Sequence, residues 1–263
     1  MIHTDNNNRI DTERFQYALS LYNASKSHNN RAEPGSIGTL GEKSLHAVLK
    51  LYYEPDSSRH ELPVGEHIAD IVGEEGVIEI QTRRLSALKN KLKSLLEICR
   101  VTVVHPIITG KRIISVSGET GEVISVRKSP KHGTLYTEMR EIYALREHLT
   151  EENLTLKLPL LTADEYRTYG VRTNRRKKQR TKRGEYISDI IPTDIIDEIT
   201  LAQSSDYAIL MPQGLPDAFG VRTFAEAAGT DEPSARMAIN LLVRTGHLLH
   251  CGKEGNARIY SPT

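Results

Sequence analysis

Apolar residues recur along the chain with two periods, one typical of helices and one typical of strands. Leu45, Val48, Leu49 and Tyr52 have the i, i+3, i+4, i+7 spacing of a helix with one buried face. Short runs rich in valine and isoleucine, separated by turn residues, are typical of strands. These patterns predict helices over 11–27, 40–53, 85–98 and 135–149, and strands over 61–72, 77–82, 101–108, 111–117, 122–128 and 154–160.

The C-terminal part has a pattern of its own. It predicts a short helix over 224–228 that ends at Gly229, a longer helix over 233–245, and a hairpin over 247–262. The fold class that we expect is α/β for the larger domain, with a small α+β domain attached. The predicted segments are an N-terminal helix and loop (1–35), the α/β domain (36–162), a basic linker or arm (163–186) and the small domain (187–263).

The charge of the chain is balanced overall but uneven along it. The 263 residues are 38% hydrophobic and 26% charged, with a formal net charge of +1, which allows a sizeable core and excludes a wholly disordered or collagen-like chain. Eight basic residues and no acid stand between 171 and 184: Arg172, Arg175, Arg176, Lys177, Lys178, Arg180, Lys182 and Arg183. Such a block favours contact with nucleic acid phosphates, and a solvated arm or localisation tract is the alternative.

The cysteines and the search for targeting segments bear on where the protein is expected to reside. Cys99 and Cys251 are the only cysteines, and their spacing does not suit a zinc site, so we expect both to be reduced. The N-terminal residues lack the apolar stretch of a signal peptide, and no apolar run reaches the roughly 20 residues that span a bilayer. We therefore expect a cytoplasmic protein with no membrane partner.

Acidic residues are expected to converge on the predicted hairpin around the turn at 73–76. Alternation along the strand 77–82 sends Val77, Glu79 and Gln81 to one face. Asp70 stands on the neighbouring strand, where cross-strand neighbours lie about 5 Å apart. Two carboxylates with the Ile80 backbone carbonyl between them would suit a magnesium ion, which prefers oxygen ligands.

Glu42 is a third candidate acid. It stands on the core-facing side of the predicted helix 40–53, where an acid needs a partner. It also fits a capping box with Thr39, because it would occupy the third helical position. The sequence permits a cap, a place near the metal, or both.

Residues 36–108 resemble the PD-(D/E)xK nuclease superfamily. Asp70 matches the first acid of the motif, Glu79-Ile80-Gln81 matches the triplet, and Glu42 matches the helical acid that precedes them in many members. The resemblance implies an α-β-β-β-α-β core and a catalytic set of Glu42, Asp70, Glu79 and Gln81. It also implies Mg²⁺, with Mn²⁺ as a substitute, held by Asp70, Glu79 and the Ile80 carbonyl, with Glu42 as a further ligand.

Gln81 departs from the lysine that is usual in this superfamily. Some restriction-type members carry Gln at this position, so the change does not exclude activity. Lys89 or Lys93 on the following helix could take the place of the missing lysine. A catalytically inactive domain is the alternative.

The C-terminal segment resembles a winged helix-turn-helix domain. In DNA-binding members the second helix enters the major groove, which would present Arg236, Asn240 and Arg244 to the bases and phosphates. The wing would add Lys253, Asn256 and Arg258. Winged helices also serve as dimerisation or protein-docking modules, which leaves a homodimer or a protein partner open. A further basic loop with Arg127, Lys128 and Lys131 could line the substrate groove.

These expectations together predict a metal-dependent endonuclease that hydrolyses DNA phosphodiester bonds, with transposition or phage defence as possible settings. A non-catalytic DNA-binding regulator or adaptor with a degenerate nuclease fold is the first alternative. A nuclease that acts on RNA is the second.

Overall fold

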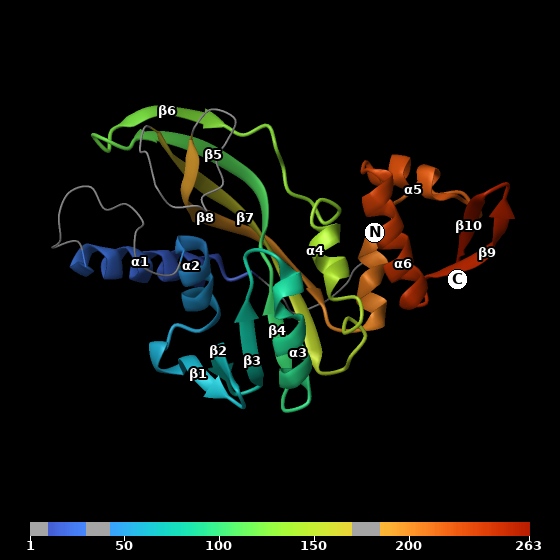
Figure 1. Ribbon diagram of the computed structural model, residues 1–263, viewed down its shortest axis with the longest axis horizontal. Coiled ribbons are helices and arrows are strands. Elements are labelled where there is room, and N and C mark those ends of the chain that lie inside the picture. Colours follow the sequence, from blue (N-terminus) through green and yellow to red (C-terminus); the bar gives the residue numbers. More distant parts are fainter. Residues whose placement is uncertain (1–9, 30–42, 170–184) are drawn as a thin grey trace. The chain divides into compact units, whose positions relative to one another are not determined.

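The computed structural model describes residues 10–29, 43–169 and 185–263 (Figure 1). The chain is a mixed α/β protein with a large mixed sheet, in agreement with the expected fold class at this level. Its residues divide into two compact units, one made of 1–60, 108–132 and 159–198 and the other of 61–107, 133–158 and 199–263. Each unit is described by itself.

The first unit combines two helices from its N-terminal segment with strands from two later segments of the chain. Helices α1 (Thr12–Asn29) and α2 (Ser44–Tyr53) pack through the rings of Phe15 and Tyr52, whose centroids lie 5.5 Å apart. The strands are β5 (Ile107–Ser117), β6 (Val123–Lys128), the later residues of β7 (Leu154–Tyr169) and most of β8 (Tyr186–Leu201). Strand β7 pairs with β5 and β8, and β5 pairs with β6.

The sheet of the second unit has the strand order β1-β2-β3-β4-β7. Strands β3 and β4, and β4 and β7, are parallel, and their valines and leucines are buried, as expected for a sheet covered on both faces. The bounds of these elements are β1 (His60–Val64), β2 (His67–Gly73), β3 (Gly76–Ile80), the 3₁₀ turn η2 (Leu85–Leu88), α3 (Lys89–Leu96), β4 (Val101–Val104) and α4 (Met139–Ala144).

The remaining elements of the second unit come from the C-terminal segment. They are η3 (Ser204–Leu210), α5 (Val221–Ala228), α6 (Glu232–Arg244), β9 (Leu248–Glu254) and β10 (Ala257–Pro262). The buried Tyr207 donates to the Leu149 carbonyl at 3.1 Å, and the Tyr136 hydroxyl donates to Leu210 at 2.9 Å. This segment therefore packs against the rest of its unit.

The pattern of strands differs from the prediction at four places. The predicted strand 61–72 is two strands, because Gly65 takes a left-handed φ of 57° and turns the chain. The predicted strand 101–108 breaks at His105 and Pro106, where proline offers no N–H to the ladder. Residues 163–169, expected in a linker, continue β7, and 186–201, expected at the boundary of the small domain, form β8.

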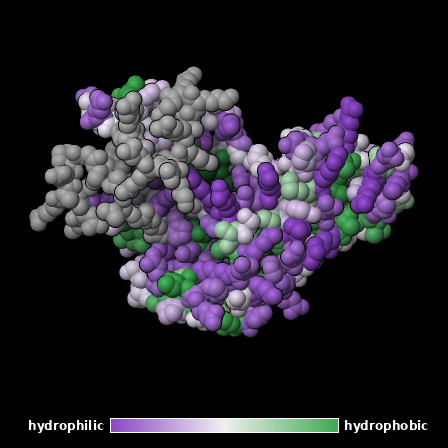
Figure 2. All heavy atoms as spheres, viewed as in Figure 1, coloured by the Kyte–Doolittle hydropathy of each residue, from purple (hydrophilic) through white to green (hydrophobic). Residues whose placement is uncertain are grey.

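The surface drawn in Figure 2 is mostly hydrophilic, as expected for a chain with 26% charged residues. On the face drawn in Figure 2, hydrophilic side chains predominate over the described part of the chain, with hydrophobic residues in scattered groups. Among the described residues, no helix has the length and the apolar character needed to cross a membrane.

Candidate functional site

Asp70 and Glu79 lie side by side on strands β2 and β3. The antiparallel register pairs Ile71 with Ile78 and Gly73 with Gly76, so its continuation brings Asp70 opposite Glu79. Asp70 accepts a hydrogen bond from the Ile80 N–H at 2.7 Å, and its own N–H donates to Glu79 Oε1 at 3.4 Å. Each carboxylate therefore accepts a main-chain N–H of the other strand, Asp70 from Ile80 and Glu79 from Asp70.

Gly76 fixes the turn that sets this register. Its φ of 133° suits glycine, and a Cβ at this position would lie 2.2 Å from the carbonyl oxygen of Arg100. The Val77 N–H donates to the same carbonyl at 2.9 Å. The start of β3 is thereby held against the chain that leads into β4, and a slip of the hairpin would break this fit.

Lys91 supplies the positive charge next to the acid pair. Its Nζ lies 2.5 Å from Glu79 Oε2 and donates to the Ile68 carbonyl at 2.7 Å. The sequence pointed to Lys89 or Lys93. Residues 85–88 form a 3₁₀ turn before α3 begins, and such a turn advances about 20° more per residue than an α-helix. The leucines counted at α-helical period from Leu85 are nevertheless buried, so their spacing identified the core face of this segment but not the lysine that meets Glu79.

The charge on Glu79 is only partly compensated. Its exposed fraction is 3%. Burial raises the pKa of the Glu79 carboxyl, the hydrogen bond from Lys91 lowers it, and the negative charge of Asp70 raises it again, with a net increase. A divalent cation between the two carboxylates would favour their charged forms.

Asp70 and Glu79 are the two expected carboxylate ligands that lie within the described residues. Within the described ranges, no group of three or more His, Cys, Asp or Glu side chains is placed to hold a metal. The main-chain group of Ile80 that contacts the acid pair is its N–H, which donates to Asp70. Glu42, the third expected acid, lies outside the described residues, as does its predicted capping box.

Gln81 follows β3 and adjoins a buried histidine that the sequence pattern did not single out. The Gln81 N–H donates to the Val104 carbonyl at 2.9 Å. The Gln81 carbonyl accepts from His105 Nδ1 at 2.6 Å, and His105 Nε2 lies 3.5 Å from Glu138 Oε2. His105 directly follows the buried parallel strand β4. This position was the signal in the sequence that could have identified it, because ligands gather at the carboxyl ends of such strands.

The basic residues expected to contact nucleic acid lie in separate parts of the chain. The eight residues of the block 171–184 lie outside the described residues. Arg127 and Lys128 are exposed on β6, and Lys131 follows them, all in the first unit, whereas the acid pair belongs to the second.

In the C-terminal segment two helices joined by a turn precede a hairpin, which is the order of elements that the sequence predicted. Asp231 caps α6 by accepting the Ser234 N–H at 2.8 Å, and Gly229 ends α5 with a φ of 59°. The hairpin of β9 and β10 pairs Glu254 with Ala257, which leaves Gly255 and Asn256 at its tip.

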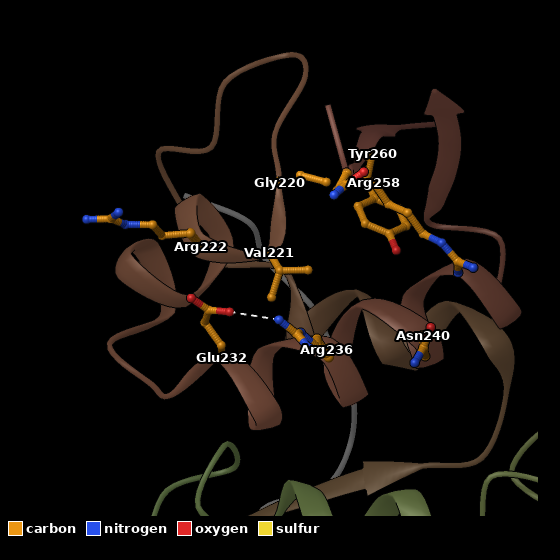
Figure 3. Close-up of a pocket in the computed structure, with 10 residues that line it drawn as sticks. Gly220, Val221, Arg222, Glu232, Arg236, Asn240, Arg258 and Tyr260 are labelled. Atoms are coloured by element: carbon orange, nitrogen blue, oxygen red, sulfur yellow. Dashed lines mark hydrogen bonds and ion pairs between the residues drawn. The ribbon is translucent and has the colours of Figure 1, made fainter. Parts of the chain in front are cut away.

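A pocket of about 560 Å³ lies between α5, α6 and β10 (Figure 3). Its lining includes Arg236 and Asn240 of α6, Arg258 of β10, and Arg222 of α5, which the sequence pattern did not single out. Arg236 pairs with Glu232 at 2.9 Å. Two further candidates do not line this pocket: Lys253 stands opposite Arg258 in the hairpin, and Arg244 donates to the Glu147 carbonyl at 3.5 Å.

Comparison with known proteins shows one family and one relative. An uncharacterized protein of Treponema pallidum (strain Nichols) is 29% identical over 226 residues, which cover 86% of this chain and 87% of the relative. No solved structure matches. Residues 43–202 match a domain of unknown function, DUF8091, a range that contains Asp70, Glu79 and Lys91 and stops before α5. Because this match covers more than half of the chain, the protein belongs to the DUF8091 family.

Proposed function

We propose that the protein is a metal-dependent endonuclease that hydrolyses DNA phosphodiester bonds. The observation that carries the proposal is the contact between Asp70 and the buried Glu79 on neighbouring strands, with Lys91 on the Glu79 carboxylate. The element order α2-β1-β2-β3-α3-β4 agrees with the core implied by the resemblance to PD-(D/E)xK nucleases.

Each residue has a role in this proposal. Asp70 and Glu79 hold a magnesium ion, which would supply the charge that stabilises the phosphate and activates the attacking water. Lys91 takes the part of the lysine that Gln81 replaces, because its ammonium group already lies at the second acid. Gln81, held through its main chain by His105 and Val104, orients water or phosphate.

The C-terminal segment would hold the DNA in this proposal. Arg236, Arg258 and Arg222 surround one pocket, and arginines that neutralise phosphates release counterions and give a salt-dependent affinity. Docking of a protein partner is the alternative use of the same surface.

A non-catalytic DNA-binding adaptor is the second candidate function. The observation that favours it is the ion pair between Lys91 and Glu79, which gives the buried acid a partner without a metal. In this case the acid pair would be a structural remnant, and DNA binding through the arginines would remain.

Cleavage assays separate the two functions. We expect the full-length protein to cut plasmid, linear or branched DNA with Mg²⁺ or Mn²⁺, and Asp70→Asn and Glu79→Gln to lower the rate by more than the roughly 10–100-fold typical of residues behind a metal ligand. Lys91→Met should lower the rate while Mn²⁺ still binds.

The matched control is Glu74→Gln with Glu75→Gln, which removes exposed acids from the same hairpin and should keep the activity. Absence of metal-dependent cleavage on all three substrates would overturn the nuclease proposal and leave the adaptor. Cleavage that survives both Asp70→Asn and Glu79→Gln would show that the activity belongs to another site or a contaminant.

A further inference from the structure

The segment that follows strand β3 carries a run of positive charge next to the acid pair. Residues 81–96 contain five basic residues and no acid: Arg83, Arg84, Lys89, Lys91 and Lys93. Lys91 contacts Glu79, so its charge is already used at the acid pair. None of the other four forms a side-chain hydrogen bond or an ion pair with another residue in the described ranges. Their charges are therefore not neutralised within the described part of the chain.

Arg84 has a backbone conformation that residues other than glycine seldom adopt. Its φ of 46° and ψ of 70° lie in the left-handed region. The next residue, Leu85, is fully buried and donates its N–H to Glu141 Oε2 at 2.8 Å, while the Arg84 carbonyl accepts from the Ala87 N–H at 2.9 Å. Strained residues that their surroundings hold in place are concentrated at binding and catalytic sites, which directs attention to the exposed Arg83 and Arg84.

This turn lies at the carboxyl end of β3, the end that carries Glu79. Strands β3 and β4 are parallel, and ligands of such sheets bind at the carboxyl ends of the strands. Arg84 follows Glu79 by five residues, so their Cα atoms are at most about 18 Å apart. Each strand of a DNA duplex carries a phosphate about every 3.4 Å along the axis. A backbone that lies at the acid pair would therefore present further phosphates within this distance.

We propose that Arg83 and Arg84 form a phosphate-binding site that holds the DNA backbone beside the acid pair. The planar guanidinium group suits this ligand, because it can donate two parallel hydrogen bonds to one phosphate. The fixed main chain at Arg84 reduces the ordering that binding would require. The site rests on the proposed function for its ligand, since both the nuclease and the adaptor would bind DNA.

The salt dependence of DNA binding tests this site. Fluorescence anisotropy measures the affinity of the full-length protein for a short labelled DNA duplex, with Ca²⁺ in place of Mg²⁺, over roughly 50–200 mM salt. Arg83→Gln and Arg84→Gly should each lower the slope of log affinity against log salt by about 0.9, and the double variant by about 1.8. Arg84→Gly should fold like the wild type, because glycine adopts the left-handed conformation readily.

Arg100→Gln is the matched control. It removes an exposed positive charge that precedes β4, at the opposite end of the parallel strands, and should leave the slope unchanged. An unchanged slope in the double variant would overturn the phosphate site, as would an equal loss in Arg100→Gln, which would indicate a general effect of charge. A wild type that does not bind DNA would overturn it as well.

Cleavage assays with Mg²⁺ keep this site apart from the proposed nuclease. We expect the double variant to raise KM more than it lowers kcat, since the two arginines would bind the substrate and the transition state alike. Metal-dependent cleavage with an unchanged KM and salt slope in the double variant would refute the phosphate site alone. A reduced salt slope without any cleavage by the wild type would refute the nuclease alone, and the site would then belong to the adaptor.

Discussion

Two buried glutamates in this protein have opposite electrostatic surroundings. Glu79 shares its site with a second acid, Asp70, and one cation, Lys91, and the net effect raises its pKa. Glu165 on β7 is 1% exposed and contacts two cations, Lys111 and Arg167. Burial raises the pKa of Glu165, but hydrogen bonds from these two cations outweigh it and lower the pKa overall.

The difference separates Glu165, whose charge is neutralised by two cations, from Glu79, whose pKa stays raised. Glu165 has more positive than negative charge around it, and Arg167 also reaches Glu185 at 3.4 Å, so the group forms a closed structural network. Glu79 keeps a raised pKa despite its contact with Lys91, and a bound cation would lower that pKa. A buried acid with a raised pKa is a candidate for function, whereas a neutralised one is a candidate for stability.

Removal of the Glu165 charge should have the largest effect on stability. Glu165→Gln leaves Lys111 and Arg167 without their shared carboxylate, and the loss of one partner from a buried ion pair costs about 3–5 kcal/mol. Urea denaturation followed by circular dichroism measures this loss. The exposed Glu119→Gln in the same unit is the control and should change little. A loss below about 1 kcal/mol for Glu165→Gln would contradict the structural role of the network.

The same comparison explains how far the sequence predicts the fold and the site. The acid pair was predictable because a turn with glycines separates two runs of valine and isoleucine, which fixes both the hairpin and its register. The full length of β7 was not, because Asp164, Glu165 and Arg167 interrupt its apolar pattern. Those charges are neutralised across the sheet, where Arg112 donates twice to Asp164 and Lys111 contacts Glu165. A pairing between distant segments leaves no local signal.

Lys91 shows the same limit at the site. Its helix was predictable from the leucines at 88, 92, 95 and 96, all of which are buried. These leucines identify the core face of the helix, but which of its lysines reaches Glu79 depends on how the helix lies against β3, a tertiary feature without a local signal. The sequence therefore identified the two neighbouring acids, Asp70 and Glu79, but not Lys91, the lysine that contacts Glu79.

Added metal should have an intermediate effect. If Asp70 and Glu79 bind Mn²⁺ or Mg²⁺, the free energy of unfolding should rise by about 2.7 kcal/mol at 100 times the dissociation constant. Thermal denaturation with and without the ion measures the shift. Asp70→Asn and Glu79→Gln should abolish it, and the double replacement of Glu74 and Glu75 by glutamine should keep it. A shift that persists in both site variants would place the ion elsewhere.

The smallest effect on the free energy of unfolding is expected for Glu79→Gln without metal. The sign of this change is the sharpest test of the difference between Glu79 and Glu165. The change leaves one cation, Lys91, without its carboxylate, whereas Glu165→Gln leaves two, and it also relieves a buried charge next to Asp70. Because the folded-state pKa of Glu79 is raised, its ionised form costs stability above that pKa, and the cost is absent below the unfolded pKa near 4.5. We therefore expect Glu79→Gln to equal or slightly exceed the wild type at pH 7.

Glu165 should behave in the opposite way with pH. Its folded-state pKa is lowered, so its contribution is present above the unfolded pKa and is lost as the pH falls through the folded pKa. The gap between wild type and Glu165→Gln should then shrink below pH 4.5, while any advantage of Glu79→Gln disappears over the higher range between its two pKa values. Urea denaturation at a series of pH values from 7 to 3 measures both. A Glu79→Gln protein that loses as much stability at pH 7 as Glu165→Gln would show that Lys91 already completes the site, and the argument for a cation between Asp70 and Glu79 would fail.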